Sequence, residues 1–580
     1  MFVDAEHSII VGSPIEIVDI FEKLGSDIVF TADRHAWPDN SLALQYPEVH
    51  SSLPPYLSAM AFVGKKESIC SLFTAEPEAF NVESLDAMQL ALTNLYLKKE
   101  IRDKYGMKLD HKNILFQSMY DSASELTVKY LGSHSFLLNT EFDTTPKVVV
   151  ANGANVELNR LSDYVPDGWS QSAGCQSCQE ERKSLADVPP ERMPLVLLSI
   201  FIEYATPFLP TMLLRLVHLN YPLSRIILCV HNDMEFHKPN VTEFLASSIV
   251  AEFHSVEIIQ SEKYAVEGDY RNTVIDVCER LKCDYLFALD SNAHIDNPHT
   301  LKKLIEQNRP IIAPLLRRPN ELWSNFWGSV SASGYYSRSS DYMDIINGVK
   351  RGIWNVPCVS SAILFKAEIL PKLKNAWHSR QYDADVAFCS SMRTKNLFMF
   401  IDNQFHYGHL VNSDYYNTSH YRPELWELNT NRLDWEELYI DNKYWAIGGQ
   451  DGANDASKYE TKCHDVFVFP LVTPQFCRHL IEEMEHYGQW SGGKAYDPRI
   501  SGGYENVPTV DIHMKQINYH SEWLEILKKY ISPLAKFAFT GYEPESRAHM
   551  AFVVRYHPKE QDRLRPHFDS STWTGKFVFF

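Results

Sequence analysis

The segment Leu195-Val-Leu-Leu-Ser-Ile-Phe-Ile202 is the longest compact apolar run of this chain. It is too short to span a bilayer, and it predicts a buried strand. Shorter apolar runs follow at residues 226–230, 285–289 and 311–313, and segments of helical period such as residues 212–219 lie between them. Strands that alternate with helices favour a doubly wound, mostly parallel sheet of the α/β class.

The residues before this run predict a domain of the same class. Residues 28–31 and 147–150 predict short strands, and residues 84–98 predict a helix with apolar side chains on one face. We therefore expect a first α/β domain at residues 1–165. A polar stretch rich in Ser, Gln and Glu then indicates a linker at residues 166–190.

The second α/β domain is expected at residues 191–447, and a second polar stretch predicts a linker at residues 448–462. The last region, residues 463–580, begins with a strand predicted at residues 466–469. A helix follows, with Thr473 as its N-cap and proline at its first position. Its predicted buried face consists of Phe476, Leu480, Ile481 and Met484, and Gly488 is predicted to end the helix.

Composition restricts the class of protein. At 580 residues the chain is long enough for roughly three or four domains. The net charge of −19 argues against general nucleic-acid binding, which needs a basic face. We see no apolar run long enough to cross a membrane and no signal peptide at the N-terminus.

Cysteines and glycosylation sequons favour an oxidising, secretory compartment. Among ten cysteines, Cys175-Gln-Ser-Cys178 predicts a local disulfide, with free thiols as the alternative. Cys278 and Cys283 are the other disulfide candidates. The sequons Asn240-Val-Thr and Asn417-Thr-Ser are candidate glycosylation sites.

A His-x-Asp pair near the end of the chain indicates iron chemistry. An apolar strand is predicted at residues 550–556, and Arg565-Pro-His567-Phe-Asp569 follows it. In 2-His-1-carboxylate sites, such a pair supplies two ligands and leaves positions open for substrate and oxygen. About one His-x-Asp is expected by chance in a chain with this many histidines. A second copy, His231-Asn-Asp233, is interpreted as structural.

Acidic residues at strand ends give a second candidate chemistry. Glycosyltransferases of the GT-A class hold a divalent metal with an Asp-x-Asp pair at the end of an inner strand, and carboxylate oxygens suit Mn²⁺. Phe2-Val-Asp4-Ala-Glu6-His7 and Leu289-Asp290-Ser-Asn292 are partial versions of this pattern. We interpret Asp290 as a strand-end residue that caps a turn.

Several long motifs resemble the procollagen-lysyl hydroxylases (procollagen-lysine 2-oxoglutarate 5-dioxygenases). They are Leu322-Trp-Ser-Asn-Phe-Trp-Gly328, Tyr415-Tyr-Asn-Thr-Ser-His-Tyr421, Glu482-Glu-Met-Glu-His-Tyr-Gly488, Ser501-Gly-Gly-Tyr-Glu-Asn-Val-Pro508, Asp511-Ile-His-Met-Lys-Gln516 and Leu564-Arg-Pro-His567. The resemblance covers nearly the whole chain. It implies two GT-A-like (Rossmann-type) α/β domains, the second an accessory domain, followed by an incomplete double-stranded β-helix (jelly-roll) dioxygenase domain.

The resemblance also implies an activity. Fe(II), 2-oxoglutarate, O₂ and L-ascorbate would support hydroxylation of lysine at the X-Lys-Gly sites of procollagen chains in the endoplasmic reticulum lumen. A homodimer is implied, and peripheral association with that membrane is left open. His567 and Asp569 match the first two iron ligands, and Tyr556 matches a tyrosine near the cosubstrate.

In the N-terminal domain, the resemblance places Asp4 as the first carboxylate for Mn²⁺ and a UDP-sugar. His7 stands where the second acid belongs, so we expect sugar transfer to be weakened. At the other end, the family pattern continues beyond Thr574 to a distal His ligand and an Arg that pairs with 2-oxoglutarate, neither of which follows here. We therefore expect that this polypeptide alone does not turn over collagen peptide.

Two rival functions remain open at this point. One is a collagen hydroxylysine glycosyltransferase that uses the N-terminal domain. The other is a non-catalytic collagen-binding or assembly subunit that acts through residues 190–445.

Overall fold

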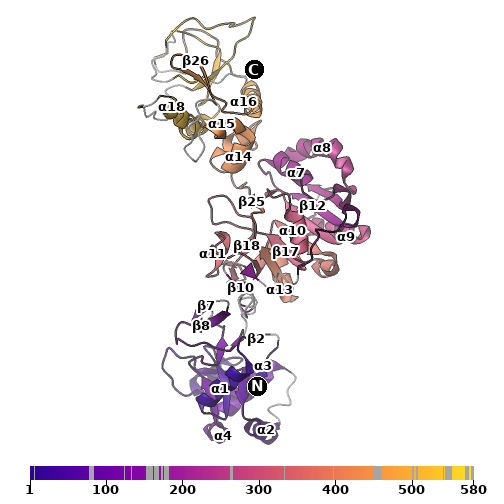
Figure 1. Cartoon of the computed structure of the whole chain (residues 1–580), viewed down its shortest axis with the longest axis vertical. Coiled ribbons are helices and arrows are strands. Elements are labelled where there is room, and N and C mark those ends of the chain that lie inside the picture. Colours follow the sequence, from indigo (N-terminus) through magenta and orange to yellow (C-terminus); the bar gives the residue numbers. More distant parts are fainter. Residues whose placement is uncertain are drawn as a thin grey trace. The chain divides into compact units, whose positions relative to one another are not determined.

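The computed structural model describes the chain in two compact units, each containing segments distant in sequence (Figure 1). The first comprises Met1–Glu203, Met212–Asp233 and Thr242–Leu410, and the second comprises Tyr204–Thr211, Met234–Val241 and Val411–Phe580. The description covers all residues except 6, 78–83, 123–124, 132–133, 152–157, 159–160, 162–168, 171–173, 176–181, 262–264, 332–333, 396, 448–458, 500–501, 504–506, 540, 542–550, 569–573 and 577–580.

The N-terminal part is an α/β arrangement, as predicted. A four-stranded sheet has the order β1-β4-β3-β5, and a three-stranded sheet has the order β2-β9-β6. The strands are β1 (Phe2–Val3), β2 (Ser8–Ile10), β3 (Ile28–Asp33), β4 (Tyr56–Gly64), β5 (Met107–Asp110), β6 (Phe116–Ser118) and β9 (Val148–Val150), with a hairpin of β7 (Leu126–Leu131) and β8 (His134–Asn139). The helices are α1 (Pro14–Leu24), α2 (Lys66–Ala75), α3 (Leu85–Leu97) and α4 (Lys99–Lys104).

The middle part of the chain forms an eight-stranded sheet. Its order is β14-β13-β12-β15-β23-β17-β24-β21. The strands are β14 (Ser255–Ile259), β13 (Ile226–Asn232), β12 (Val196–Ile202), β15 (Tyr285–Asp290), β23 (Ala362–Lys366), β17 (Ile311–Pro314), β24 (Met399–Asp402) and β21 (Ile353–Val356). The four predicted strands are confirmed as β12, β13, β15 and β17.

The prediction of a mostly parallel sheet is confirmed, because six of the eight strands run in one direction and β23 and β21 run in the other. Strands β14, β13, β12 and β15 are parallel, whereas β23 runs antiparallel to both β15 and β17. All seven residues of β12 are buried, because helices cover both faces of this inner strand. The helices of this part are α7 (Leu209–Val217), α8 (Lys238–Leu245), α9 (Glu267–Leu281), α10 (Thr300–Glu306), α11 (Tyr342–Ile346), α12 (Leu370–Leu373) and α13 (Ala384–Thr394).

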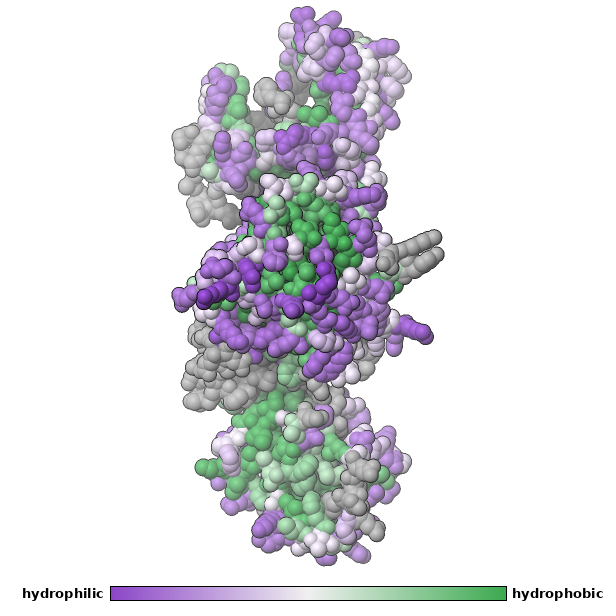
Figure 2. Space-filling model, turned by 90° about the vertical axis from the view of Figure 1, so that its right-hand side faces the viewer, coloured by the Kyte–Doolittle hydropathy of each residue, from purple (hydrophilic) through white to green (hydrophobic). Residues whose placement is uncertain are grey.

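Apolar side chains are also exposed on this part of the chain. Val256 and Ile258 of the edge strand β14 and Leu214 of α7 are 39%, 55% and 57% exposed. Figure 2 shows apolar surface on the side of the middle part where Figure 1 labels α7 and α9.

Three short antiparallel pairs complete this part: β16 (Ala293–Ile295) with β25 (Gly408–Leu410), β18 (Phe326–Trp327) with β22 (Cys358–Val359), and β19 (Ser329–Val330) with β20 (Tyr336–Ser337).

The second unit has an aromatic core between helices. Trp435, Tyr439, Phe476 and Tyr530 are buried and pack with ring centroids 5.3–6.1 Å apart. The helices are α14 (Arg432–Tyr439), α15 (Asn442–Ile447), α16 (Pro474–Tyr487), α17 (His520–Ile526) and α18 (Ser532–Ala538). The strands are β26 (Glu460–Cys463), β27 (Val466–Val468), β28 (Asp511–His513) and β29 (Phe552–Val554).

The double-stranded β-helix stays a prediction. Among the described residues of 463–580, the strands form two separate antiparallel pairs, β26 with β27 and β28 with β29. The strand predicted at residues 550–556 is shorter than expected, because only Phe552–Val554 pair with β28. Met550 lies outside the described residues.

The predicted linkers contain short strands. Residues 460–462 belong to β26, while residues 448–458 lie outside the description. In the first linker, β10 (Trp169–Ser170) pairs with β11 (Gly174–Cys175). No helix in the described part of the chain is long and apolar enough to cross a membrane.

Helix α16 begins and ends as predicted, but its buried face differs at one position. The hydroxyl of Thr473 accepts the Phe476 amide at 3.3 Å, and Gly488 closes the helix with a φ of 66°. Phe476, Leu480 and Met484 are at most 1% exposed, whereas Ile481 is 39% exposed. Helical periodicity puts positions 480 and 481 about 100° apart, so only one of them can face the centre of the core.

We expect Phe476→Ala to destabilise the second unit by about 3–5 kcal/mol, because it leaves a cavity between Trp435 and Tyr439. Ile481→Ala is the matched control and should cost at most about 1.5 kcal/mol, because much of that side chain is in water. Urea unfolding followed by tryptophan fluorescence measures both. Equal losses would contradict the assigned face.

Candidate functional site

His567, the first predicted iron ligand, lies on an exposed irregular segment after β29. Its Nδ1 is 2.8 Å from the carbonyl oxygen of Arg565, to which it donates. That bond places the imidazole lone pair on Nε2, the tautomer that a metal-binding histidine needs. Tyr556, on the same segment, is 51% exposed. Asp569 lies outside the described residues, so the structure gives no geometry for the His567–Asp569 pair.

A second group of metal-binding side chains lies in the same region. Donor atoms of Asp497, Asp511 and His513 lie within 4.8 Å of one another. Asp511 and His513 occupy alternate positions of β28, so their side chains project from the same face of the strand. Asp511 is 1% exposed and accepts a hydrogen bond from the Thr509 hydroxyl.

Arg499 occupies the position between the two carboxylates. Its Nη2 is 2.6 Å from Asp497 Oδ2 and 2.6 Å from Asp511 Oδ1, and its Nη1 donates to Gln516 Oε1 at 2.8 Å. The hydrogen bond from Arg499 lowers the pKa of Asp497. Burial lowers the pKa of His513, which favours the neutral imidazole. The guanidinium therefore compensates the charge that a metal ion would otherwise balance.

Sequence reasoning missed this group. His513 has no neighbour at a familiar ligand spacing, and Asp497 is remote from Asp511 along the chain. The available signal was the Asp511-Ile-His513 alternation, which puts an acid and an imidazole on one face of a strand.

Replacing Arg499 by Gln should destabilise the second unit by about 3 kcal/mol, because it leaves the Asp511 carboxylate buried without a counter-charge. Urea unfolding at pH 7 measures the loss. The double variant Arg499→Gln/Asp497→Asn should recover part of it, because the two groups are coupled. Arg563→Gln is the control, since Arg563 is 84% exposed. A loss no larger than that of the control would contradict the role of Arg499.

The predicted glycosyltransferase pair is brought together in the N-terminal part. Asp4 directly follows β1, and its amide donates to the Met60 carbonyl of β4 at 2.8 Å. His7 Nδ1 is 2.7 Å from Asp4 Oδ1, and the two side chains are 28% and 18% exposed for His7 and Asp4. A carboxylate and an imidazole at this distance suit Mn²⁺ in their donor types.

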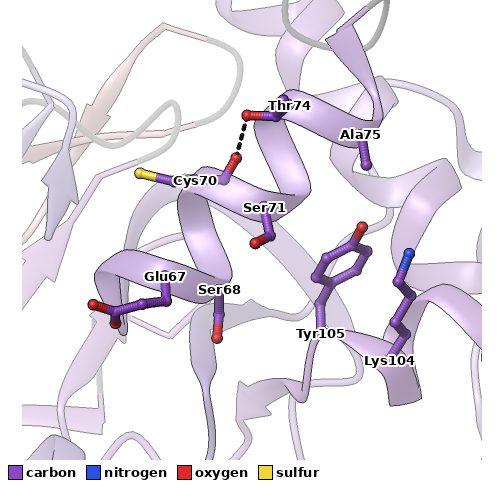
Figure 3. Close-up of a pocket in the computed structure, with 8 residues that line it drawn as sticks. All are labelled: Glu67, Ser68, Cys70, Ser71, Thr74, Ala75, Lys104 and Tyr105. Atoms are coloured by element: carbon purple, nitrogen blue, oxygen red, sulfur yellow. Dashed lines mark hydrogen bonds between the residues drawn. The ribbon is translucent and has the colours of Figure 1, made fainter.

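An open hollow on the N-terminal part has no carboxylate–imidazole pair among its lining residues (Figure 3). Its walls come from α2 and from the end of α4. The Thr74 hydroxyl donates to the Cys70 carbonyl there at 2.7 Å. The lining residues are Glu67, Ser68, Cys70, Ser71, Thr74, Ala75, Lys104 and Tyr105, and neither Asp4 nor His7 is among them.

Two further sequence candidates are engaged in internal contacts. The Asp290 carboxylate binds the guanidinium of Arg271 at 2.6 Å. His231 is 1% exposed and stacks on Tyr270 with ring centroids 3.7 Å apart. Asp290 ends β15, as expected, but the partner of its carboxylate is Arg271 of α9 and the predicted turn cap stays a prediction. His231 lies in the interior, which agrees with its interpretation as a structural residue.

The cysteine and sequon candidates differ in their surroundings. Cys278 and Cys283 form a disulfide, and Cys358 and Cys389 form another that the sequence did not indicate. Cys175 lies in β11, and Cys178 lies outside the described residues. Of the two sequons, Asn417 is exposed in a turn where its Oδ1 accepts the Ser419 amide at 3.0 Å, whereas Asn240 is half-buried in α8.

Two family models match different parts of the chain. A family described as the PLOD GT domain matches residues 1–175, and the N-terminal domain of glycosyltransferase family 25 matches residues 193–415. Two solved structures resemble it weakly. A mannosyltransferase from Pyrobaculum calidifontis has a TM-score of 0.29 and 13% identity over 43% of this chain and 67% of that one. Staphylococcus aureus TarS 1–349 has a TM-score of 0.26 and 13% identity over 40% and 66%.

Full-length relatives are much more similar. The multifunctional procollagen lysine hydroxylase and glycosyltransferase LH3 of Rattus norvegicus is 41% identical over 99% of this chain and 76% of its own length. Procollagen-lysine,2-oxoglutarate 5-dioxygenase 1 of Mus musculus is 40% identical over 99% and 78%. The human enzyme of that name is 39% identical over 99% and 78%. The chain therefore belongs to the procollagen lysyl hydroxylases, the family of iron- and 2-oxoglutarate-dependent procollagen-lysine 5-dioxygenases.

Proposed function

We propose that this protein hydroxylates lysine at X-Lys-Gly positions of procollagen chains. From the sequence alone we expect no turnover of collagen peptide by this polypeptide, and the wild-type succinate assay described below decides between the two. The observation that carries the proposal is the similarity of about 40% over 99% of the chain to procollagen-lysine dioxygenases, together with a His567-Phe-Asp569 sequence at the expected place. The last region, residues 463–580, would contribute a double-stranded β-helix to this activity.

His567 and Asp569 would hold Fe(II), with 2-oxoglutarate as cosubstrate and ascorbate as reductant. The donor types fit, because imidazole and carboxylate are two of the ligands of non-haem Fe(II) oxygenases. When bound, the ion would activate O₂, which is the oxidant for C–H hydroxylation, and 2-oxoglutarate would supply the other two electrons. The Arg565 carbonyl accepts the Nδ1 proton of His567 and orients its ring, and Tyr556 would lie near the cosubstrate.

Compartment and assembly follow from the same proposal. The two disulfides need an oxidising environment, which agrees with the endoplasmic reticulum lumen. Asn417 is the better of the two glycosylation sites, because it is exposed in a turn, whereas Asn240 lies within a helix. A homodimer is part of the proposal.

His567→Ala should reduce both Fe(II) affinity and collagen-peptide-dependent succinate formation by at least about 100-fold, because removal of a ligand costs more than removal of a ligand's hydrogen-bond partner. Metal titration and succinate release measure the two effects. His557→Ala is the matched control, an exposed histidine of the same segment. Iron-dependent succinate release that survives in His567→Ala would contradict the assignment.

A second activity, Mn²⁺-dependent transfer from a UDP-sugar, is favoured by the Asp4–His7 contact at 2.7 Å and by the match of residues 1–175 to a glycosyltransferase domain. Asp4 and His7 would hold the metal, which would supply positive charge for the diphosphate of the UDP-sugar. The acceptor would be hydroxylysine of the same collagen chains.

Asp4→Asn should lower Mn²⁺ affinity and UDP-sugar hydrolysis by at least about tenfold, because the amide lacks the charge that binds the cation. Electron paramagnetic resonance of Mn²⁺ and release of UDP are the measurements. Asp19→Asn, on the exposed face of α1, should leave both unchanged. Mn²⁺ binding that is equal in the two variants would rule out Asp4 as a ligand.

A further inference from the structure

Four carboxyl groups surround one guanidinium at the carboxyl-terminal edge of the eight-stranded sheet. Glu203 directly follows β12, and Asp290 is the last residue of β15. Glu267 lies in the first turn of α9 and Asp385 in the first turn of α13. Arg271, also on α9, is the guanidinium at the centre. These residues come from four elements, so the edge of the sheet brings them together.

Arg271 ties α9 to the sheet. Its Nη2 is 2.9 Å from Glu267 Oε1 and 2.6 Å from Asp290 Oδ1. Its guanidinium lies over the Phe201 ring, 3.8 Å from the centroid. Phe201 pairs in register with His231 on one side and with Asp290 on the other, so the three side chains stand in a row beneath α9. The Arg271 side chain is 8% exposed.

The charges in this cluster do not balance. Arg271 neutralises one carboxylate, while Glu267, Asp290, Glu203 and Asp385 would carry four negative charges if all were ionised. Burial raises the pKa of Glu203 to about 8 and that of Asp385 to about 7, and it also raises the pKa of Asp290. The cluster therefore retains at least one proton near neutral pH.

The position of that proton follows from the contacts of Glu203. Its Oε1 is buried and has no hydrogen-bond donor among the described residues, and its carboxyl group is within hydrogen-bond reach of Glu267. Two carboxyl groups share a hydrogen bond only when one of them is protonated. The proton therefore belongs between Glu203 and Glu267.

Among the residues that the structure describes around the cluster, the other charged groups do not supply a second cation. His231 of β13 is buried, and burial lowers its pKa, so the ring is neutral. Asp383, before α13, adds a negative charge next to Asp385. His378 is 3.0 Å from Asp269, whose carboxylate caps α9 at the Val266 amide.

We propose that this carboxylate cluster is a proton-dependent latch. A proton shared by Glu203 and Glu267 holds the first turn of α9 on the sheet edge at and below neutral pH, and its loss at higher pH releases that turn by repulsion between the carboxylates. The latch is a property of the middle part alone and does not depend on either proposed activity.

The sign of the pH effect follows from linkage. The pKa of Glu203 is raised from 4.5 to about 8 in the folded chain, so the folded state binds the proton more tightly. Its contribution to stability is complete below about pH 4.5 and is lost as the pH rises towards 8. We therefore expect α9 to open more often as the pH rises from 6 to 8.5.

Hydrogen exchange of the full chain, read by mass spectrometry on peptides that cover α9, tests the latch. After correction for the intrinsic exchange rate, the opening equilibrium of α9 should rise with pH by up to about tenfold per unit below the folded pKa of Glu203, about 8, and level off above it. Glu203→Gln should make this rise clearly smaller, because the amide stays neutral and reproduces the protonated carboxyl, and only the remaining carboxyl groups of the cluster still titrate. Asp385→Asn should keep the rise but shift its midpoint to lower pH. Glu203 still titrates in this variant, and its pKa falls because one neighbouring charge is gone.

Glu191→Gln, an exposed glutamate of the same unit, is the control and should behave as the wild-type chain. A flat profile in the wild-type chain would overturn the proposal. The same pH dependence in Glu203→Gln as in the wild type would overturn it as well. Failure of Glu203→Gln to fold would also contradict it, since the latch requires the neutral side chain to be the stable form.

Discussion

The ion pairs of Arg271 are the interaction on which the middle part of this protein depends. Strand β12 is buried on both faces, so helices must cover both sides of the sheet. Helix α9 covers the row formed by His231, Phe201 and Asp290, and Arg271 fixes it there through Asp290. A buried guanidinium needs carboxylates around it, and the edge where several strands end is where such carboxylates collect.

Buried Arg271 and partly exposed Arg499 show the same physical rule with opposite outcomes. Arg499 meets two carboxylates, Asp497 and Asp511, and its remaining donors reach Gln516. These residues together carry one excess negative charge, and hydrogen bonds from Arg499 stabilise both carboxylates. Arg271 faces four carboxyl groups, so its cluster must hold protons to exist in a buried setting. The first arrangement is a closed network, whereas the second is sensitive to pH.

The proposed iron ligand has a different environment from either cluster. His567 is exposed on an irregular segment, where the Arg565 carbonyl accepts the Nδ1 proton of its ring. In the N-terminal part, the Asp4–His7 pair follows the short strand β1 and is also partly exposed. Accessible donors suit metal ions and substrates that enter from solvent, whereas the buried clusters stabilise the fold.

The sequence by itself determined the elements whose signals are local. The run at residues 195–202, the cap at Thr473 and the terminator at Gly488 each act within a few residues, and each was predicted at its observed place. The His567-x-Asp569 motif and the Asp4–His7 pair are short-range too. Only the tertiary structure decided that β23 enters the sheet antiparallel, that Ile481 faces water, and that Asp497 meets Asp511 through Arg499. It also decided that Glu203, Glu267, Asp290 and Asp385 share one guanidinium. These features join residues far apart in the chain, and the free energy of such contacts depends on burial and charge that no local pattern carries.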